Sequence, residues 1–312
     1  MIVAATTEAG LSWDLADGIR AMFAYPFMVN AFRAGTVVAV TAGVIGWFMI
    51  LRRQTFAGHA LAMAGFPGAA GAIWLGVGAT YGYFAFCLTA ALAVAAIPAA
   101  GGGGGSAGGS AGRSEESAAV GTVQAFALAC GFLFVSLYQG FLGGVNALLF
   151  GSFLGITGGM VRTLAVLALV VLVMLAVIGR PLLFASLDPA VATAAGVPVR
   201  GLSTAFLILL GTATAEVSQI TGTLLVFTLL VIPAATAQVL TARPVLSLTL
   251  TVLLGVLVTW AGLTVAYYSP YPIGFFITSF SFGLYLLARL AVGVHDMLGR
   301  AARGPRMAGA PA

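Results

Sequence analysis

The sequence predicts an all-α polytopic membrane protein with eight or nine transmembrane helices and a short cytoplasmic helix. Hydrophobic residues make up 61% of its 312 positions and charged residues only 7%, whereas an ordinary soluble domain carries about 25% charged residues. A soluble globule of this length needs a charged exterior, so most of this apolar surface has to face lipid. We expect the membrane domain to cover residues 28–294.

Stretches of about 20 apolar residues, the length that a helix needs to cross a bilayer, recur along the chain. We predict spans at 28–51, 57–78, 80–99, 119–138, 160–183, 202–220, 222–241, 245–267 and 273–294. Only Gly78 and Ala79 separate the second span from the third. The sixth and seventh spans form one apolar run, broken by Ser218, Gln219 and Gly222. These two junctions leave eight spans as the alternative to nine.

Arginine predicts the orientation of the spans, because cytoplasmic loops carry an excess of basic residues. With an outer N-terminus and nine spans, only Arg20, Arg33 and Arg162 fall on or near the outer side. The cytoplasmic side then receives Arg52, Arg53, Arg113, Arg200, Arg243, Arg289, Arg300, Arg303 and Arg306. Because the arginines are scattered at the ends of spans, they indicate contact with membrane lipid and give no sign of nucleic-acid binding.

Three segments are expected to lie outside the spans. In the N-terminal segment 1–27, residues 11–25 place apolar and charged side chains at helical spacing up to Pro26, which is typical of a helix in the membrane interface. Residues 100–118 are rich in glycine and serine and predict a flexible cytoplasmic loop. The tail at 295–312 is predicted to be cytoplasmic and disordered.

A short helix is predicted between the fifth and sixth spans. Asp188 can cap the free N–H groups of a first helical turn, and Pro189 suits the position after it. Gly196 is the residue type that ends a helix in the left-handed conformation. The sequence therefore predicts a two-turn cytoplasmic helix from Pro189 to Ala195, which either connects two spans or docks a soluble partner.

The chain contains no lysine, and this excludes two kinds of chemistry. A P-loop needs its lysine to reach nucleotide phosphates, and a Schiff base needs a lysine amine. The sequence has no HExxH pair either. We therefore expect no enzyme and no ATPase site in this chain, so any ATP would be used by a partner subunit.

Several segments resemble the permease subunits of bacterial zinc/manganese-type ABC transporters. The similar stretches occur in family order over 28–292. They are RAGTVVAVTAGVIGWFMILRRQTFAGHALAMAGFPGAAGA (33–72), LLFGS (148–152), DPAVATAAGVPV (188–199), GTLLVFTLLVIPAATAQVL (222–240) and YYSPYPIGFFITSFSFGLYLLARL (267–290). The most specific of them is the IPAATA element in the fourth stretch.

The resemblance implies a set of partners. A second permease copy would complete a homodimeric or pseudo-dimeric pore, an ABC ATPase would dock below each copy, and an extracytoplasmic solute-binding protein would deliver the metal. It also implies that residues 188–199 are the coupling helix. The residues expected to meet the ATPase are Asp188, Pro189, Ala192, Gly196 and Val197.

In the family, the motif Gly-Asp-Ala-Leu-Ser-His supplies an aspartate and a histidine to the cation. The present sequence departs from this motif. The matching residues read GHALAM at 58–63, so His59 stands at the carboxylate position and Met63 at the histidine position. Residues four apart share one helix face, and two copies could supply four ligands. Imidazole and thioether favour zinc or copper(I) over manganese. Alternatively, His59 forms a hydrogen bond to a neighbouring helix and Met63 packs in the core.

Glu216 is the only acid deep within the spans. Ionisable residues inside a membrane are expensive and are often functional. This carboxylate could replace the one missing from the metal path, or it could pair with Arg33 or Arg162. Glycine and proline residues that could shape a gate, or simply pack, are Pro67, Gly68, Gly222 and Pro233.

We expect an ABC permease that imports a divalent transition metal, zinc before manganese, with no permanently bound cofactor. A permease for a metal chelate or another small solute is the first alternative. A stand-alone secondary transporter is the second, although such proteins need coupling carboxylates within the membrane and Glu216 alone is present.

Overall fold

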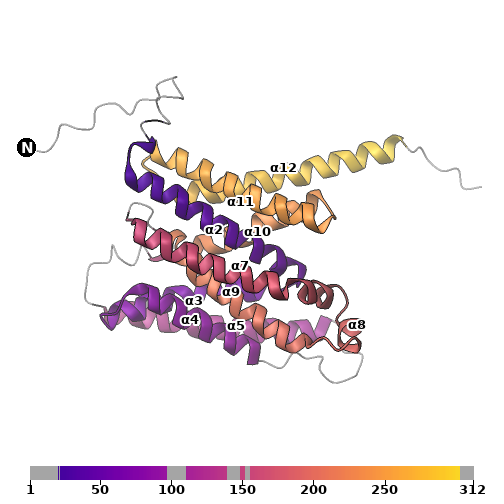
Figure 1. Cartoon of the computed structure of the whole chain (residues 1–312), viewed down its shortest axis with the longest axis horizontal. Coiled ribbons are helices and arrows are strands. Elements are labelled where there is room, and N and C mark those ends of the chain that lie inside the picture. The colour runs from indigo at the N-terminus through magenta and orange to yellow at the C-terminus, as the bar shows by residue number, and fades with distance from the viewer. Residues whose placement is uncertain (1–19, 21, 97–109, 139–147, 152–154, 303–312) are drawn as a thin grey trace, which may run out of the picture.

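The protein is a bundle of long helices (Figure 1). The computed structural model describes residue 20 and residues 22–96, 110–138, 148–151 and 155–302. Within this part of the chain, nine helices are long and apolar enough to cross a membrane. They are α2 (Pro26–Leu51), α3 (Thr55–Trp74), α4 (Ala79–Ala96), α5 (Ser110–Leu137), α7 (Gly158–Leu187), α9 (Val199–Thr221), α10 (Thr223–Leu240), α11 (Pro244–Tyr267) and α12 (Ile273–Ala302). The prediction of nine spans is confirmed, and the eight-span alternative is wrong.

Both doubtful junctions are real breaks, and a glycine makes each of them possible. The chain between α3 and α4 turns at Gly76, whose φ is +73°. At Gly222, between α9 and α10, φ is +71° and ψ is 160°. A side chain would be strained in either conformation, so these breaks depend on residues without a Cβ.

Two predicted loops are shorter than expected. Helix α5 begins at Ser110, so residues 110–118 are helical and do not belong to the flexible loop. Helix α12 continues to Ala302, so residues 295–302 are not part of a disordered tail. Neither extension contains proline, the residue that most strongly opposes a helix, so nothing in these residues stops the helix from continuing into water. The expected interfacial helix at 11–25 falls mostly outside the described residues, and all of 100–109 and 303–312 falls outside them.

Helix α2 lies at the centre of the bundle. It contacts α7, α9, α10 and α11, while α3 packs against α4, α5 and α9. Figure 1 shows α11 and α12 along one side and α3, α4 and α5 along the other, with α2, α7, α9 and α10 between them. Buried side chains of α2, α3, α9 and α10 meet in one hydrophobic core.

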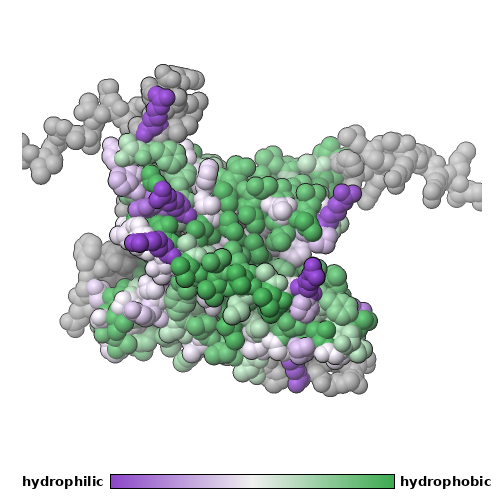
Figure 2. All heavy atoms as spheres, viewed as in Figure 1, coloured by the Kyte–Doolittle hydropathy of each residue, from purple (hydrophilic) through white to green (hydrophobic). Residues whose placement is uncertain are grey.

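The outer surface fits a lipid environment. Figure 2 shows an apolar belt across the face with α7, with hydrophilic residues gathered toward the two ends of the helices. Exposed apolar side chains of α7 include Val166, Leu169, Val173 and Val177. Such a surface is stable only where water is absent, as between the two faces of a bilayer.

Candidate functional site

Helix α3 is enclosed by other helices except along one narrow stripe. Between Ala57 and Ala72 every residue is buried apart from His59 and Met63, which are half-buried. These two side chains lie four residues apart and therefore on the same face of the helix. The structure thus brings the two predicted ligands together and leaves them as the accessible positions of this part of α3.

The imidazole of His59 faces α10. Its ring meets the ring of Phe227 edge to face, with the centroids 4.7 Å apart and the planes at 70°. Its Nδ1 atom is buried and has no hydrogen-bond partner. At this nitrogen the alternative of a hydrogen bond to a neighbouring helix is therefore wrong, and the nitrogen has a lone pair or a proton to offer to another group.

Pro67 interrupts the backbone hydrogen bonding of α3 just beyond this stripe. A proline has no N–H, so the carbonyl of Met63, four residues earlier, loses its usual helical donor. The ring of Pro67 is buried beside Gly131 of α5, and Gly68 meets the backbone of Gly82 of α4. The second half of α3 is therefore packed tightly, while its first half presents an imidazole and a thioether.

Glu216 lies on a different helix interface. It is fully buried in α9, neither carboxyl oxygen has a hydrogen-bond partner, and Thr41 of α2 is the polar side chain beside it. The hydroxyl of Ser218, two residues further on, lies beside Gly65 of α3. Residues two apart point in nearly opposite directions around a helix. Glu216 is therefore directed away from α3, and a pairing with Arg33 or Arg162 is wrong, because both arginines are exposed.

The break at Gly222 lies deep in the bundle. A Cβ at Gly65, which is midway along α3, would touch Thr223 and Ser218 on the two sides of the break. Residues 148–151 cover the break, since the backbone of Gly151 meets Ile220 and Thr221. The sequence identified Gly222, but it gave no sign of this covering segment or of the buried Thr223 hydroxyl, which also lacks a partner.

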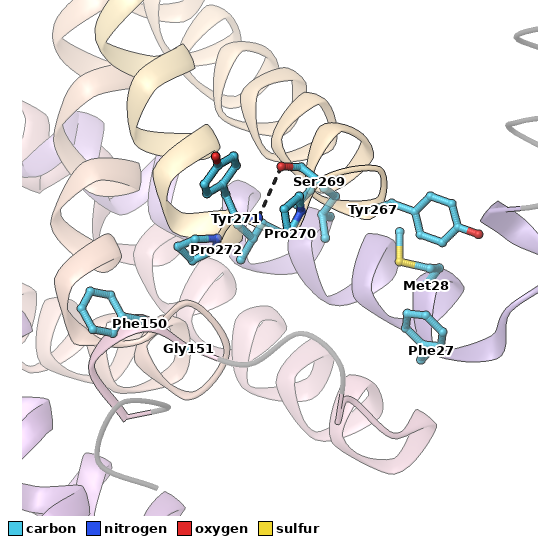
Figure 3. Close-up of a pocket in the computed structure, with 12 residues that line it drawn as sticks. Phe27, Met28, Phe150, Gly151, Tyr267, Ser269, Pro270, Tyr271 and Pro272 are labelled. Atoms are coloured by element: carbon cyan, nitrogen blue, oxygen red, sulfur yellow. Dashed lines mark hydrogen bonds between the residues drawn. The ribbon is translucent and has the colours of Figure 1, made fainter. Parts of the chain in front are cut away.

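A pocket of about 620 Å³ opens at the end of the bundle where α2 begins (Figure 3). Phe27 and Met28 line one side and Phe150 and Pro272 the other, and the backbone N–H of Tyr271 donates to Ser269 Oγ at 3.3 Å. Gly151 connects this pocket to the covered break. None of the predicted ligand residues lines it.

The remaining predicted gate residue, Pro233, is buried in α10 beside Gly255 of α11. This position fits packing between the two helices. Among the residues that the structure describes, no three His, Cys, Asp or Glu side chains lie close enough together to hold a metal ion.

The short helix forms as predicted, one residue shorter than expected. It is α8 (Pro189–Ala194), and Asp188 Oδ1 accepts from the N–H groups of Ala190 at 3.1 Å and Val191 at 3.0 Å. Gly196 has a φ of +82°, as a helix-ending glycine should. Ala192 is buried and Val197 packs against the core. Figure 1 shows α8 at the end of the bundle where α12 ends.

Comparison with known proteins shows several relatives. The ABC 3 transport family matches residues 24–292. "Manganese transport system membrane protein MntC" of Halalkalibacterium halodurans is 29% identical over 242 residues, which cover 78% of this chain and 79% of that one. "Chelated iron transport system membrane protein YfeC" of Yersinia pestis is 28% identical over 276 residues, or 88% and 90%.

A solved structure has a similar fold. "PsaBC from Streptococcus pneumoniae in complex with Fab" superposes with a TM-score of 0.75 and 25% sequence identity. The match covers 88% of this chain and 94% of that one. The similarity therefore extends over nearly the whole bundle.

Proposed function

This chain belongs to the ABC 3 transport family, and on that premise we propose that it is the permease subunit of an importer for a divalent transition metal, with zinc as its main cargo. It is a multi-pass protein of the cytoplasmic membrane, with nine apolar helices over the region that the family matches. The observation that carries the proposal is the stripe on α3, where His59 and Met63 are the only accessible positions between Ala57 and Ala72.

The stripe offers ligands that suit a transient zinc site. Imidazole nitrogen is a common zinc ligand, and a thioether is soft. Both groups are neutral, so binding is weaker than with the family carboxylate, and a transported ion must be released as well as bound. A second copy of the chain, facing the first across this stripe, would complete the coordination.

The drive for transport comes from outside the chain. Helix α8 is a capped two-turn helix at the predicted cytoplasmic end, and it suits docking to a separate ATP-binding-cassette ATPase. ATP binding there would move α8 and rock the spans between outward-open and inward-open states. An extracytoplasmic binding protein would deliver the metal at the opposite end, where the 620 Å³ pocket opens.

Manganese is the second candidate cargo, and the names of the relatives favour it. The similar protein of Halalkalibacterium halodurans is named for manganese, and that of Yersinia pestis for chelated iron. Manganese prefers oxygen ligands, so His59 and Met63 argue for zinc. A metal chelate or another small solute is the remaining alternative within the transporter class.

The test is uptake of metal by a strain that lacks the gene, complemented with variants. Cellular zinc, manganese and iron would be measured by elemental mass spectrometry after growth in metal-poor medium. We expect the wild-type gene to restore zinc, and His59→Ala and Met63→Leu to restore little of it. Met160→Leu is the matched control, because Met160 is also a half-buried methionine but lies on α7. Restoration of manganese alone would select the second candidate, and unchanged metals in all strains would point to a non-metal solute.

A further inference from the structure

Arg52 occupies an unusual position at the turn between α2 and α3. It is the first residue after α2, and its guanidinium is partly buried. Nη1 donates to Ser186 Oγ at 3.3 Å and Nη2 donates to Ser203 Oγ at 2.9 Å. Nε donates to Gln54 Oε1 at 3.3 Å, and the cation lies 5.4 Å from the centroid of the Phe206 ring. Burial lowers the pKa of Arg52, because loss of water disfavours the charged form.

These contacts join the two ends of the segment that carries α8. Ser186 lies in the last turn of α7, just before α8, and Ser203 lies in the first turns of α9, just after it. One guanidinium therefore holds both flanks of this segment. The planar fork of arginine fits this task, since it directs separate N–H groups toward two acceptors.

The same turn is firmly attached to the first half of α3. Only residues 52–54 separate the two helices. The side chain of Met49 at the end of α2 packs directly on the backbone of Gly58. A Cβ at this position would overlap the sulfur atom of Met49. His59 lies four residues beyond Thr55, where α3 begins, which is about one helical turn or about 6 Å along the axis.

The neighbouring arginine makes no comparable contact. Arg53 is exposed and has a φ of +57°. Arg53 follows Arg52 directly in the loop that is predicted to be cytoplasmic, so both arginines count equally under the positive-inside rule. Arg53 therefore serves only the orientation of the protein in the membrane, whereas Arg52 also holds neighbouring segments of the fold together.

We propose that Arg52 is a positioning residue that transmits movement of α8 to the half of α3 that carries His59 and Met63. The proposal rests on the proposed function, since α8 moves only if an ATPase docks there. When the flanks of α8 shift, the guanidinium carries the α2–α3 turn with them, and the stripe changes its position relative to α10. Without this link, the α2–α3 turn loses its direct attachment to the flanks of α8, and the stripe should respond much less to movement of α8.

The test uses the full transporter, assembled from the permease, its ATPase and its binding protein in lipid nanodiscs or vesicles. Hydrogen–deuterium exchange is measured on peptides covering 186–203 and 54–63, with and without a non-hydrolysable ATP analogue. In the wild type, the analogue should change exchange in both peptides. In Arg52→Gln it should change only 186–203, and zinc uptake should fall by at least about tenfold, since bonds to a charged group are lost. ATPase co-purification should stay within about twofold.

Further variants separate the link from other effects. Arg53→Gln removes the same charge at the next position and should behave as the wild type. Arg52→Lys keeps the charge but lacks the fork, so it should behave as Arg52→Gln. If Arg52→Gln does not assemble, the double variant Ser186→Ala and Ser203→Ala, which leaves the arginine in place, should show the same loss of response at 54–63.

The proposal is overturned if 54–63 still responds to the analogue in Arg52→Gln, or in the double serine variant, with wild-type uptake. A wild-type complex in which 186–203 does not respond would instead reject α8 as the docking helix, and so the proposed function itself. The two failures are therefore distinguishable, because one is seen at 54–63 in the variants and the other at 186–203 in the wild type.

Discussion

Replacing Gly222 by alanine should strongly destabilise the protein, because a Cβ at this position is opposed in two ways. The backbone conformation, with φ +71° and ψ 160°, belongs to a region that only glycine occupies freely, and a side chain there costs about 1–3 kcal/mol. The new Cβ would also overlap backbone atoms of Gly151 and Leu149. Backbone cannot rotate away as a side chain can, and overpacking of this kind costs about 1–3 kcal/mol. Together, strain and overlap should lower the free energy of unfolding by about 2–6 kcal/mol.

The assay is reversible unfolding in mixed detergent micelles, followed by circular dichroism, for wild type, Gly222→Ala and a control. Gly283→Ala is the control, because a Cβ at Gly283 in α12 meets nothing within 4 Å and alanine is the better helix former. We expect the control to match or exceed the wild-type free energy of unfolding. A Gly222→Ala value within about 0.5 kcal/mol of wild type would refute the reasoning, since strain and overlap each predict more.

Three further predictions concern single side chains. Asp188→Ala removes the cap of α8 and should weaken ATPase binding by about fivefold, as the loss of about 1 kcal/mol of helix stability implies; Asp188→Asn keeps the cap and should bind normally in the same pull-down titration. Glu216→Leu removes a buried carboxyl without hydrogen-bond partners, so it should raise the free energy of unfolding by about 1–3 kcal/mol with zinc uptake unchanged; loss of uptake would put Glu216 on the metal path. Trp47→Phe removes the buried 3.0 Å hydrogen bond from Trp47 Nε1 to Ser247 Oγ and should lower the free energy of unfolding by about 1–3 kcal/mol. An unchanged unfolding curve would mean that Ser247 finds another partner.

Features that depend only on residues close together in the sequence were predictable. The cap, proline and glycine of α8 gave its limits to within one residue, because each acts within a single helical turn. Gly222 was identified as a break for the same reason. The extents of α5 and α12 were underestimated, because the aqueous continuation of a helix has no hydrophobic signal and only a modest propensity favours it.

Contacts between distant segments were not predictable. In a membrane protein both the lipid face and the packed face of a helix are apolar, so periodicity does not reveal which neighbours meet. The accessible stripe of His59 and Met63 exists because all the remaining positions between Ala57 and Ala72 are buried, and the depth of the Gly222 break follows from the contact of its flanks with Gly65. Arg52 and Arg53 are equivalent in sequence, and only the fold separates the one that binds two serines from the one in water.

Helix α3 therefore consists of two parts with different attachments. Its second half is fixed where Gly68 and Gly82 let α3 and α4 touch backbone to backbone. Its first half is attached to the α2–α3 turn, and through Arg52 to both flanks of α8. Pro67 lies between the halves, where the missing hydrogen bond to Met63 weakens the helix. Movement of the turn should bend α3 at Pro67, and the ligands on its first half would move relative to the fixed half.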